Sequence, residues 1–261
     1  MFEFLRYEAR KRVKGSLYLS LGMIALAAMI VWVYPSFRNS FQEDELLDAY
    51  PPQILQLFDV ETMASLEGFL AFEFYVFGWV ILLGLYLAYS GAGLIADDVD
   101  RGRMDTILAM PVSRPQLVVE KFAALAVPIV SVNLLLPPVI LAGGWLIDES
   151  LSVADVFAVH LLSIPYLFAC AGIGLCCSVV FDRVGIAQRA ALGITFGIFL
   201  VESLLEGTGY EFLGAIVPMR YYDPNDVLLQ GEYDFVGVAI LVAITLVLVL
   251  ASSAWFTRKD V

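Results

Sequence analysis

Six long apolar runs constrain the fold of this chain more than any other feature of its sequence. A helix of about 20 apolar residues crosses the roughly 30 Å of hydrocarbon in a bilayer. The chain is 60% hydrophobic and 16% charged, with a mean hydropathy of +0.82, so its apolar residues need lipid to face. We therefore predict an all-α membrane protein with six transmembrane helices in a single domain, residues 1–261. The predicted spans are 17–34, 69–96, 122–147, 156–181, 190–205 and 235–256.

The Lys and Arg residues indicate how this chain is oriented, because cytoplasmic loops are enriched in them. Of the 15 positive residues, only Arg38 and Arg220 fall on the second side of a six-span chain. We therefore predict a cell-membrane protein with both termini and the loop 97–121 in the cytoplasm, and an external loop at 207–234. The residues on the first side are Arg6, Arg10, Lys11, Arg12, Lys14, Arg101, Arg103, Arg114, Lys121, Arg183, Arg189, Arg258 and Lys259.

The N-terminal segment combines apolar and basic residues. Phe2, Leu5 and Val13 alternate there with five Lys and Arg residues. This composition is typical of a helix that lies flat on an anionic leaflet, so we predict an interfacial helix over residues 1–16.

The net charge of −12 argues against nucleic acid as a partner. Carboxylates crowd the hydrophilic segments, and the chain has only four Lys among its 15 positive residues. An acid-rich, Lys-poor surface suits a high-salt environment, where screening weakens repulsion between carboxylates. We take this as a hypothesis that the source is a halophile, of archaeal type.

Motifs for catalysis are missing from the sequence. It has no Walker A glycine loop and no G-x-S-x-G elbow, its single histidine, His160, has no neighbouring ligand, and its three cysteines share one apolar run. We therefore expect neither an enzyme nor a bound metal or cofactor. This result disfavours a membrane-embedded enzyme, one of the alternative functions.

The loop between the second and third spans contains a short helical pattern. Gly102 follows a charged cluster, Met104, Ile107 and Leu108 recur at helical spacing, and Pro111 ends the run. This pattern predicts a short amphipathic helix. Its apolar face requires a surface to pack against, which is either a groove on a cytoplasmic partner or the membrane and the chain's own bundle.

The same loop holds an ordered series: an acidic residue, a glycine, a leucine-rich turn, a P-V-S-R segment and a lysine that opens the next span. The residues are Asp98, Gly102, Met104, Leu108, Pro111, Val112, Ser113, Arg114 and Lys121. The series resembles permease subunits of type-2 ABC exporters, nearest to the branch with the nitrous-oxide-reductase maturation permease and many archaeal permeases. Asp98 departs from the glutamate that is usual there, which keeps the charge and shortens its reach.

The resemblance implies that the loop is a coupling helix seated on a separate ATPase subunit, with the N-terminal segment as a connecting helix. Two ATPase copies, which hold ATP and Mg, would then switch two permease copies, identical or closely homologous, between inward-facing and outward-facing states. The implied ATPase contacts are Asp98, Arg101, Gly102, Met104, Ile107, Leu108, Pro111 and Arg114.

Two carboxylates lie near the outer ends of spans. Glu73 and Glu202 mark either a polar patch on an export path or side chains that reach the membrane interface. A stand-alone secondary transporter or channel is the alternative function, and it predicts more midplane charge and internal repeats than this chain has.

Overall fold

The computed structural model describes residues 3–40, 62–205, 214–215 and 217–259, and within these ranges the chain is helical and has no strand. Six helical segments are long and apolar enough to cross a membrane. The predicted all-α fold with six spans is therefore confirmed. The segments are Phe4–Arg38, Leu66–Ala92, Arg114–Leu146, Val153–Val180, Val184–Leu204 and Phe235–Arg258.

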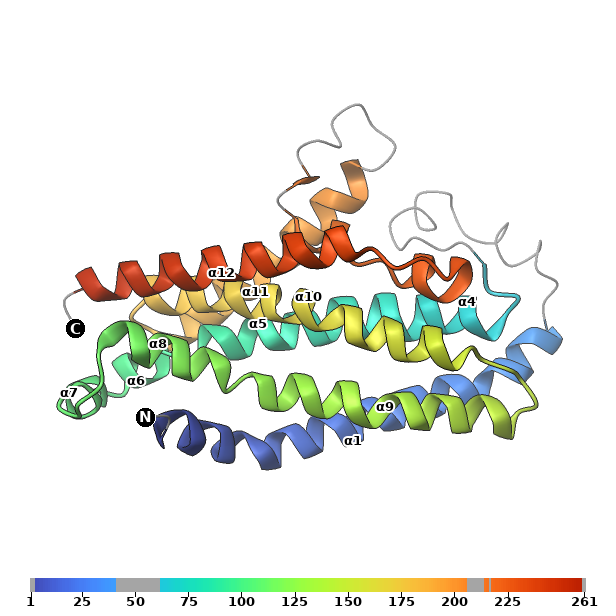
Figure 1. Ribbon diagram of the computed structural model, residues 1–261, viewed down its shortest axis with the longest axis horizontal. Helices are drawn as coiled ribbons and strands as arrows, with labels where there is room; N and C mark the ends of the chain where they lie inside the picture. The colour runs from blue at the N-terminus through green and yellow to red at the C-terminus, as the bar shows by residue number, and fades with distance from the viewer. Residues whose placement is uncertain (1–2, 41–61, 206–213, 216, 260–261) are drawn as a thin grey trace.

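The spans run alongside one another in an elongated bundle (Figure 1). The first is α1 (Glu3–Ser40); the second joins α4 (Leu66–Leu70), the π-helical η1 (Ala71–Leu83) and α5 (Gly84–Ala92); the third joins α8 (Arg114–Ala123) and α9 (Ala126–Leu146). The last three are α10 (Val153–Val180), α11 (Val184–Leu205) and α12 (Phe235–Arg258).

Helix α10 lies at the centre and packs against α5, α9, α11 and α12. Its closest neighbour is α5, because a Cβ on Gly91 would collide with the Ala171 carbonyl oxygen and one on Gly174 with that of Ala88. Small residues permit such an approach between membrane helices. The small residues Ala88, Ala92 and Ala96 at this end of the second span are likewise fully buried.

The first span differs from the expected layout. Residues 3–40 form one unbroken helix, so the predicted interfacial segment 1–16 is continuous with the span in its described part. Gly15 is tolerated inside the helix and Pro35 lies near its end, so neither residue separates two helices. The interfacial position of the first turns stays a prediction.

The third span begins earlier than hydropathy indicates. Ser113 caps α8 through its hydroxyl, which accepts a hydrogen bond from the Gln116 amide, and Pro115 occupies the first turn. Residues 114–121 of the predicted loop 97–121 are thus helical. Helix α8 is amphipathic, with Leu117, Val118 and Phe122 buried, and its polar face lowers the hydropathy of the window.

The predicted external loop 207–234 is described in part, since residues 206–213 and 216 lie outside the described ranges. Its described portion holds the short helical segments η3 (Pro218–Tyr221) and η4 (Asp226–Gln230). The buried Tyr222 hydroxyl donates a 2.9 Å hydrogen bond to the Val159 carbonyl and attaches this loop to α10.

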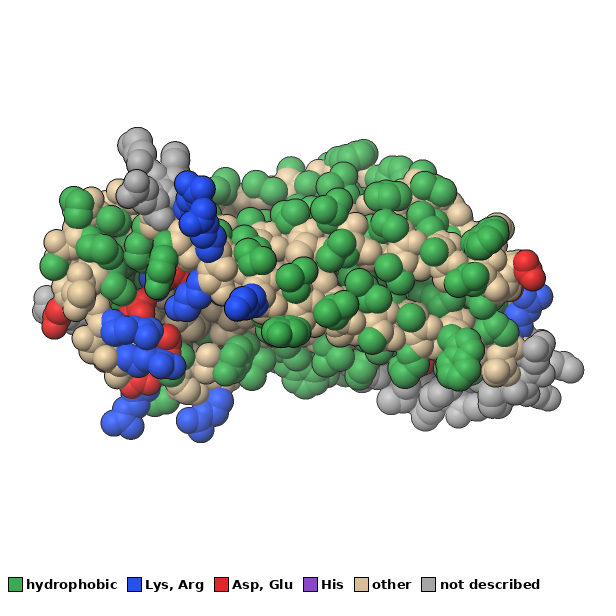
Figure 2. Space-filling model, turned by 90° about the horizontal axis from the view of Figure 1, so that it is seen from below, with side chains coloured by type: hydrophobic (Ala, Val, Ile, Leu, Met, Phe, Trp, Pro, Cys, Tyr) green, Lys and Arg blue, Asp and Glu red, His purple; other side chains and the backbone are tan. Residues whose placement is uncertain are grey.

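Both ends of the chain lie at the same end of the bundle, together with the short helices that follow α5 (Figure 1). Figure 2 shows hydrophobic side chains over the middle of the molecule and most of the visible Lys and Arg side chains gathered at that end. The arrangement agrees with an even number of spans and with the expected grouping of positive charge.

Candidate functional site

The candidate site is the segment between α5 and α8, residues 93–113, which we call the connecting loop. It contains two short helices, α6 (Ala96–Asp100) and α7 (Met104–Leu108). The start of α6 is fixed by α10, because the buried Ser178 hydroxyl oxygen accepts hydrogen bonds from the Ile95 and Ala96 amides at 2.8 and 2.9 Å. A hydroxyl of another span therefore satisfies two amides at the N-terminus of α6.

Gly102 joins the two short helices. Its φ is +63°, in the left-handed region that glycine adopts at little cost. The Arg103 amide then donates a 2.8 Å hydrogen bond back to the Asp98 carbonyl and closes the turn. The glycine picked out by the sequence pattern is thus required by the backbone.

Helix α7 is the short amphipathic helix predicted between Gly102 and Pro111. Its apolar face packs on this chain: Met104 is 3% exposed within the main core, and Ile107 and Leu108 pack partly buried against that core. The sequence allowed two packing surfaces for this helix, and in the structure α7 packs on the chain's own bundle. The opposite face of the connecting loop is exposed (Arg101, Gly102, Asp105, Thr106, Ala109, Met110 and Pro111).

A buried ion pair attaches the connecting loop to the third span. The Lys121 ammonium pairs with the Asp98 carboxylate, and their side chains are 6% and 9% exposed. Lys121 also donates a 2.8 Å hydrogen bond to the Leu94 carbonyl and lies 3.9 Å from the buried carboxylate of Glu8 on α1. Residues of α1, α6 and α8 therefore meet at one buried point, which we call the junction (Glu8, Asp98 and Lys121).

The first turn of α1 is held next to the junction. The buried Glu120 side chain of α8 accepts a 2.9 Å hydrogen bond from the Leu5 amide. Its second oxygen accepts a 2.7 Å bond from the Gln116 side chain. Since the first amides of a helix have no partner within the helix, Glu120 satisfies one of them from another span.

Asp97 organises the exposed side of the loop. Its carboxylate forms ion pairs with Arg101 at 2.7 Å and Arg103 at 2.6 Å. Partial burial acts to raise the pKa of Asp97, but the hydrogen bonds and charges of the two arginines outweigh this effect and lower the pKa. Arg103 also binds Asp98 at 2.7 Å, so it links the exposed ion pairs to the junction.

Arg114 connects the end of the loop to the last span. Its guanidinium donates to the carbonyls of Phe256, at 3.1 Å, and Lys259, and it lies over the Phe256 ring at 5.5 Å from the centroid. Lys259 in turn forms a 2.6 Å ion pair with Asp182 and donates to the Val179 carbonyl at the end of α10. Three spans, the third, fourth and sixth, are thus joined at this end.

The residues expected to contact an ATPase fall into three groups. Arg101, Gly102 and Pro111 are exposed, and Ile107, Leu108 and Arg114 are partly buried. Asp98 and Met104 are buried within this chain, so their described roles are the ion pair with Lys121 and core packing.

Three residues that hold this end of the bundle together were not indicated by the sequence pattern: Glu8, Glu120 and Ser178. For Glu8 and Glu120, the sequence does show a carboxylate close to an apolar run. Such a carboxylate requires a partner or water, so a buried contact could have been expected there. Ser178 gave no signal, since a serine in a span is compatible with any helix face.

The two outer carboxylates have separate environments. Glu202 of α11 lies 3.7 Å from the Arg220 guanidinium in η3, which fits a charge neutralised near the external loop. Glu73 is partly exposed in the first turn of η1. Their assignment to an export path or to the interface stays a prediction.

The described ranges hold no group of three or more His, Cys, Asp and Glu side chains arranged for a metal ion. His160 is buried, and its Nδ1 lies 2.7 Å from the Val156 carbonyl oxygen. Its ring packs edge-on against Tyr75 and Trp79. These contacts are those of a core histidine.

A sequence model of the family described as ABC-2 family transporter protein matches residues 4–261, nearly the entire chain. No curated protein matches it.

Proposed function

This chain belongs to the ABC-2 family of transporter proteins, and we propose that its connecting loop receives the motion of a separate ATPase subunit in an ATP-driven exporter. Family membership and the six spans make it a multi-pass membrane permease of an ABC transporter. Permeases of this family generally work with an ABC ATPase.

The observation that carries the proposal is an exposed loop surface supported by a buried attachment. Asp105, Thr106, Met110 and Pro111 face outward from the connecting loop. Beside them, a groove of about 660 Å³ runs between α7 and the first turns of α1, where it is lined by Phe4 and Tyr7 among others. The four exposed side chains named above are not part of the core, so a partner can contact them without disturbing it.

The buried attachment allows a displacement of the exposed loop surface to be transmitted to the spans. Met104 and the Asp98–Lys121 pair join the loop to α8 and α1, and Ser178 joins it to α10. Breaking a buried ion pair by removing one partner costs about 3–5 kcal/mol, so the loop moves together with these spans. This is the property that a coupling element requires.

The assembly follows from the same proposal. ATP and Mg bind to the ATPase, and this chain hydrolyses no nucleotide itself. Two ATPase copies act on two permease copies, identical or closely homologous, and both termini face the cytoplasm of a cell-membrane complex. The loop series from Asp98 to Lys121 supports the branch of the nitrous-oxide-reductase maturation permease and its archaeal relatives.

Copurification tests the proposal against a stand-alone transporter or channel. The chain is purified in mild detergent with the ATPase encoded beside its gene, as wild type and as Met110→Glu, which places a charge on the exposed surface. We expect stoichiometric ATPase with the wild type and at least a tenfold loss with M110E. Arg258→Glu, exposed at the same end, is the control. Equal recovery of the ATPase with M110E and wild type contradicts the proposed surface.

A further inference from the structure

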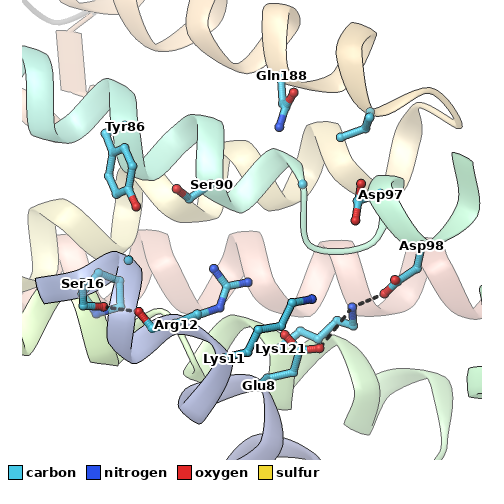
Figure 3. A pocket seen from close by; sticks show the side chains of 14 residues that line it. Glu8, Lys11, Arg12, Ser16, Tyr86, Ser90, Asp97, Asp98, Lys121 and Gln188 are labelled. Atoms are coloured by element: carbon cyan, nitrogen blue, oxygen red, sulfur yellow. Dashed lines mark hydrogen bonds and ion pairs between the residues drawn. The ribbon is translucent and has the colours of Figure 1, made fainter. Parts of the chain in front are cut away.

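A second cavity, of about 350 Å³, lies between α1, α5 and α11 next to the connecting loop (Figure 3). Basic residues of α1 line it, together with neutral polar residues of the other two helices. The polar lining consists of Glu8, Lys11, Arg12, Ser16, Tyr86, Ser90, Asp97, Asp98, Lys121 and Gln188.

Two of its positive charges form no ion pair with another described residue, although the Glu8 carboxylate, one turn before Arg12, acts on the Arg12 charge through space. Neither Lys11 nor Arg12 forms a side-chain hydrogen bond or an ion pair there, and the Arg12 Nε is buried without a partner. Figure 3 shows the Arg12 guanidinium directed into the space between α1 and α5. Because an unpaired buried donor is costly, this arrangement calls for an acceptor from outside the chain.

The carboxylates in the wall do not supply this acceptor. Asp97 is engaged by Arg101 and Arg103, and Asp98 by Lys121 and Arg103. Glu8, one turn before Arg12, lies 3.9 Å from Lys121.

The bases that contact these three carboxylates equal them in number. Because Arg101 and Arg103 contact Asp97 and Asp98 from outside the lining, Lys11 and Arg12 are positive charges beyond these pairs.

The neutral lining suits a phosphate group. Tyr86 and Ser90 of α5 and Gln188 of α11 bring hydroxyl and amide donors to the same cavity as the guanidinium. Arg binds phosphate oxygens through charge-assisted hydrogen bonds, and neutral donors complete such sites. The cavity volume falls within the range of small-ligand sites, about 300–1,000 Å³.

The position of the cavity fits the head of an amphiphile. Lys11 and Arg12 stand where α1 changes from a charged segment to a face with exposed apolar residues such as Leu17 and Leu21. Lipid phosphates lie at the corresponding boundary between hydrocarbon and water.

We propose that this cavity binds a phosphate group, carried by an anionic amphiphile or free in solution, through Lys11 and Arg12. Tyr86, Ser90 and Gln188 provide further donors. The site does not depend on the proposed coupling, because α1, α5 and α11 of this chain form the cavity without an ATPase subunit. A ligand held there lies against Asp97 and Asp98 of the loop.

Ligand titration of the full chain in detergent tests this site. The ligands are dioctanoyl phosphatidylglycerol, inorganic phosphate and dioctanoylglycerol, which has the same chains without phosphate. Saturable thermal stabilisation by phosphatidylglycerol and none by dioctanoylglycerol is expected. Stabilisation by inorganic phosphate alone also supports the site and assigns it to a free anion.

Matched variants separate the site from general surface charge. K11Q/R12Q removes the two lining charges, and R10Q/K14Q removes two exposed charges of the same helix that do not line the cavity. We expect the first variant to weaken binding at least about tenfold, equivalent to about 1.4 kcal/mol, and the second to leave it within about twofold.

A third variant keeps every charge. Ser90→Leu places a larger apolar side chain in the cavity, and we expect it to weaken binding about as much as K11Q/R12Q does. It also tests the site if K11Q/R12Q does not fold. The proposal is overturned by equal weakening in the two charge variants, by full binding in S90L, or by equal stabilisation with dioctanoylglycerol.

Discussion

Asp98 of the connecting loop and Lys121 of α8 form an ion pair with side chains only 9% and 6% exposed. Lys121 also donates to the Leu94 carbonyl, so one ammonium group holds the connecting loop at two points. The glutamate of α1 nearest to this pair, Glu8, lies 3.9 Å away. The resemblance to type-2 ABC exporters implies an ATPase contact for Asp98, which stays a prediction; its described partners, Lys121 and Arg103, belong to this chain.

Removal of one partner of this pair should destabilise the protein strongly. Asp98→Ala leaves Lys121 buried with Glu8 as its nearest carboxylate, and we expect a loss of about 3 kcal/mol in the free energy of unfolding. Denaturant unfolding in detergent measures it. Asp105→Ala, exposed on α7, is the control and should change stability by less than about 0.5 kcal/mol.

The triple variant E8Q/D98A/K121M should be more stable than D98A, because it removes the remaining buried charges of the junction. A triple variant less stable than D98A would show that the pair is not the source of the effect.

Gly102 should be sensitive to any side chain. Its φ of +63° makes Gly102→Ala unfavourable by roughly 1–2 kcal/mol, although no atom lies within 4 Å of the added Cβ. Gly22→Ala, within α1 and equally free of neighbours, should instead be neutral or slightly stabilising. Thermal unfolding measures the stability of both variants. Equal changes in stability for G102A and G22A would argue against the left-handed turn at Gly102.

Ser178 should control the order of α6. Ser178→Ala removes the acceptor of the Ile95 and Ala96 amides, and we expect their hydrogen exchange to accelerate about tenfold or more. Ser253 offers a matched control, because its buried hydroxyl has no partner within the described residues. Ser253→Ala should leave exchange in α6 unchanged. Unchanged hydrogen exchange in S178A would show that Ser178 does not hold the N-terminus of α6.

Acid should weaken the exposed side of the loop. The pKa of Asp97 is lower in the folded protein than its ordinary value of 3.8, so its ion pairs contribute stability above that value. The contribution disappears as pH falls through the lowered pKa. Denaturant unfolding at decreasing pH measures the stability difference between wild type and Asp97→Asn. This difference should be largest near neutrality and should disappear once the pH falls below the lowered pKa of Asp97. A difference that persists at the lowest pH would contradict this account.

The sequence predicted the six spans and the short helix α7 because each depends on a local pattern. Apolar length defines a span, and the spacing of Met104, Ile107 and Leu108 defines α7. The start of α8 was missed because its buried face alternates with Gln116 and Glu120, which lower its hydropathy. The end of the second span also shifted, since the chain leaves the helix after Ala92.

The contacts within the site could not be predicted from the sequence, because they join residues far apart in the chain. Nothing local distinguishes Asp98, which is buried against Lys121, from Asp105, which is exposed. The pairing of Glu120 with the Leu5 amide likewise depends on how α1 and α8 meet. Arg114, an expected ATPase contact, is engaged by the Phe256 carbonyl for the same reason.

The rate of ATP hydrolysis in the reconstituted permease–ATPase complex tests the proposed coupling most directly. The wild-type permease should change the rate of its ATPase subunit. D98A/K121M, which leaves the exposed loop surface intact, should copurify with the ATPase to the same extent but lose about 90% of that change. A D98A/K121M complex that regulates hydrolysis as the wild type does would contradict transmission through the Asp98–Lys121 pair.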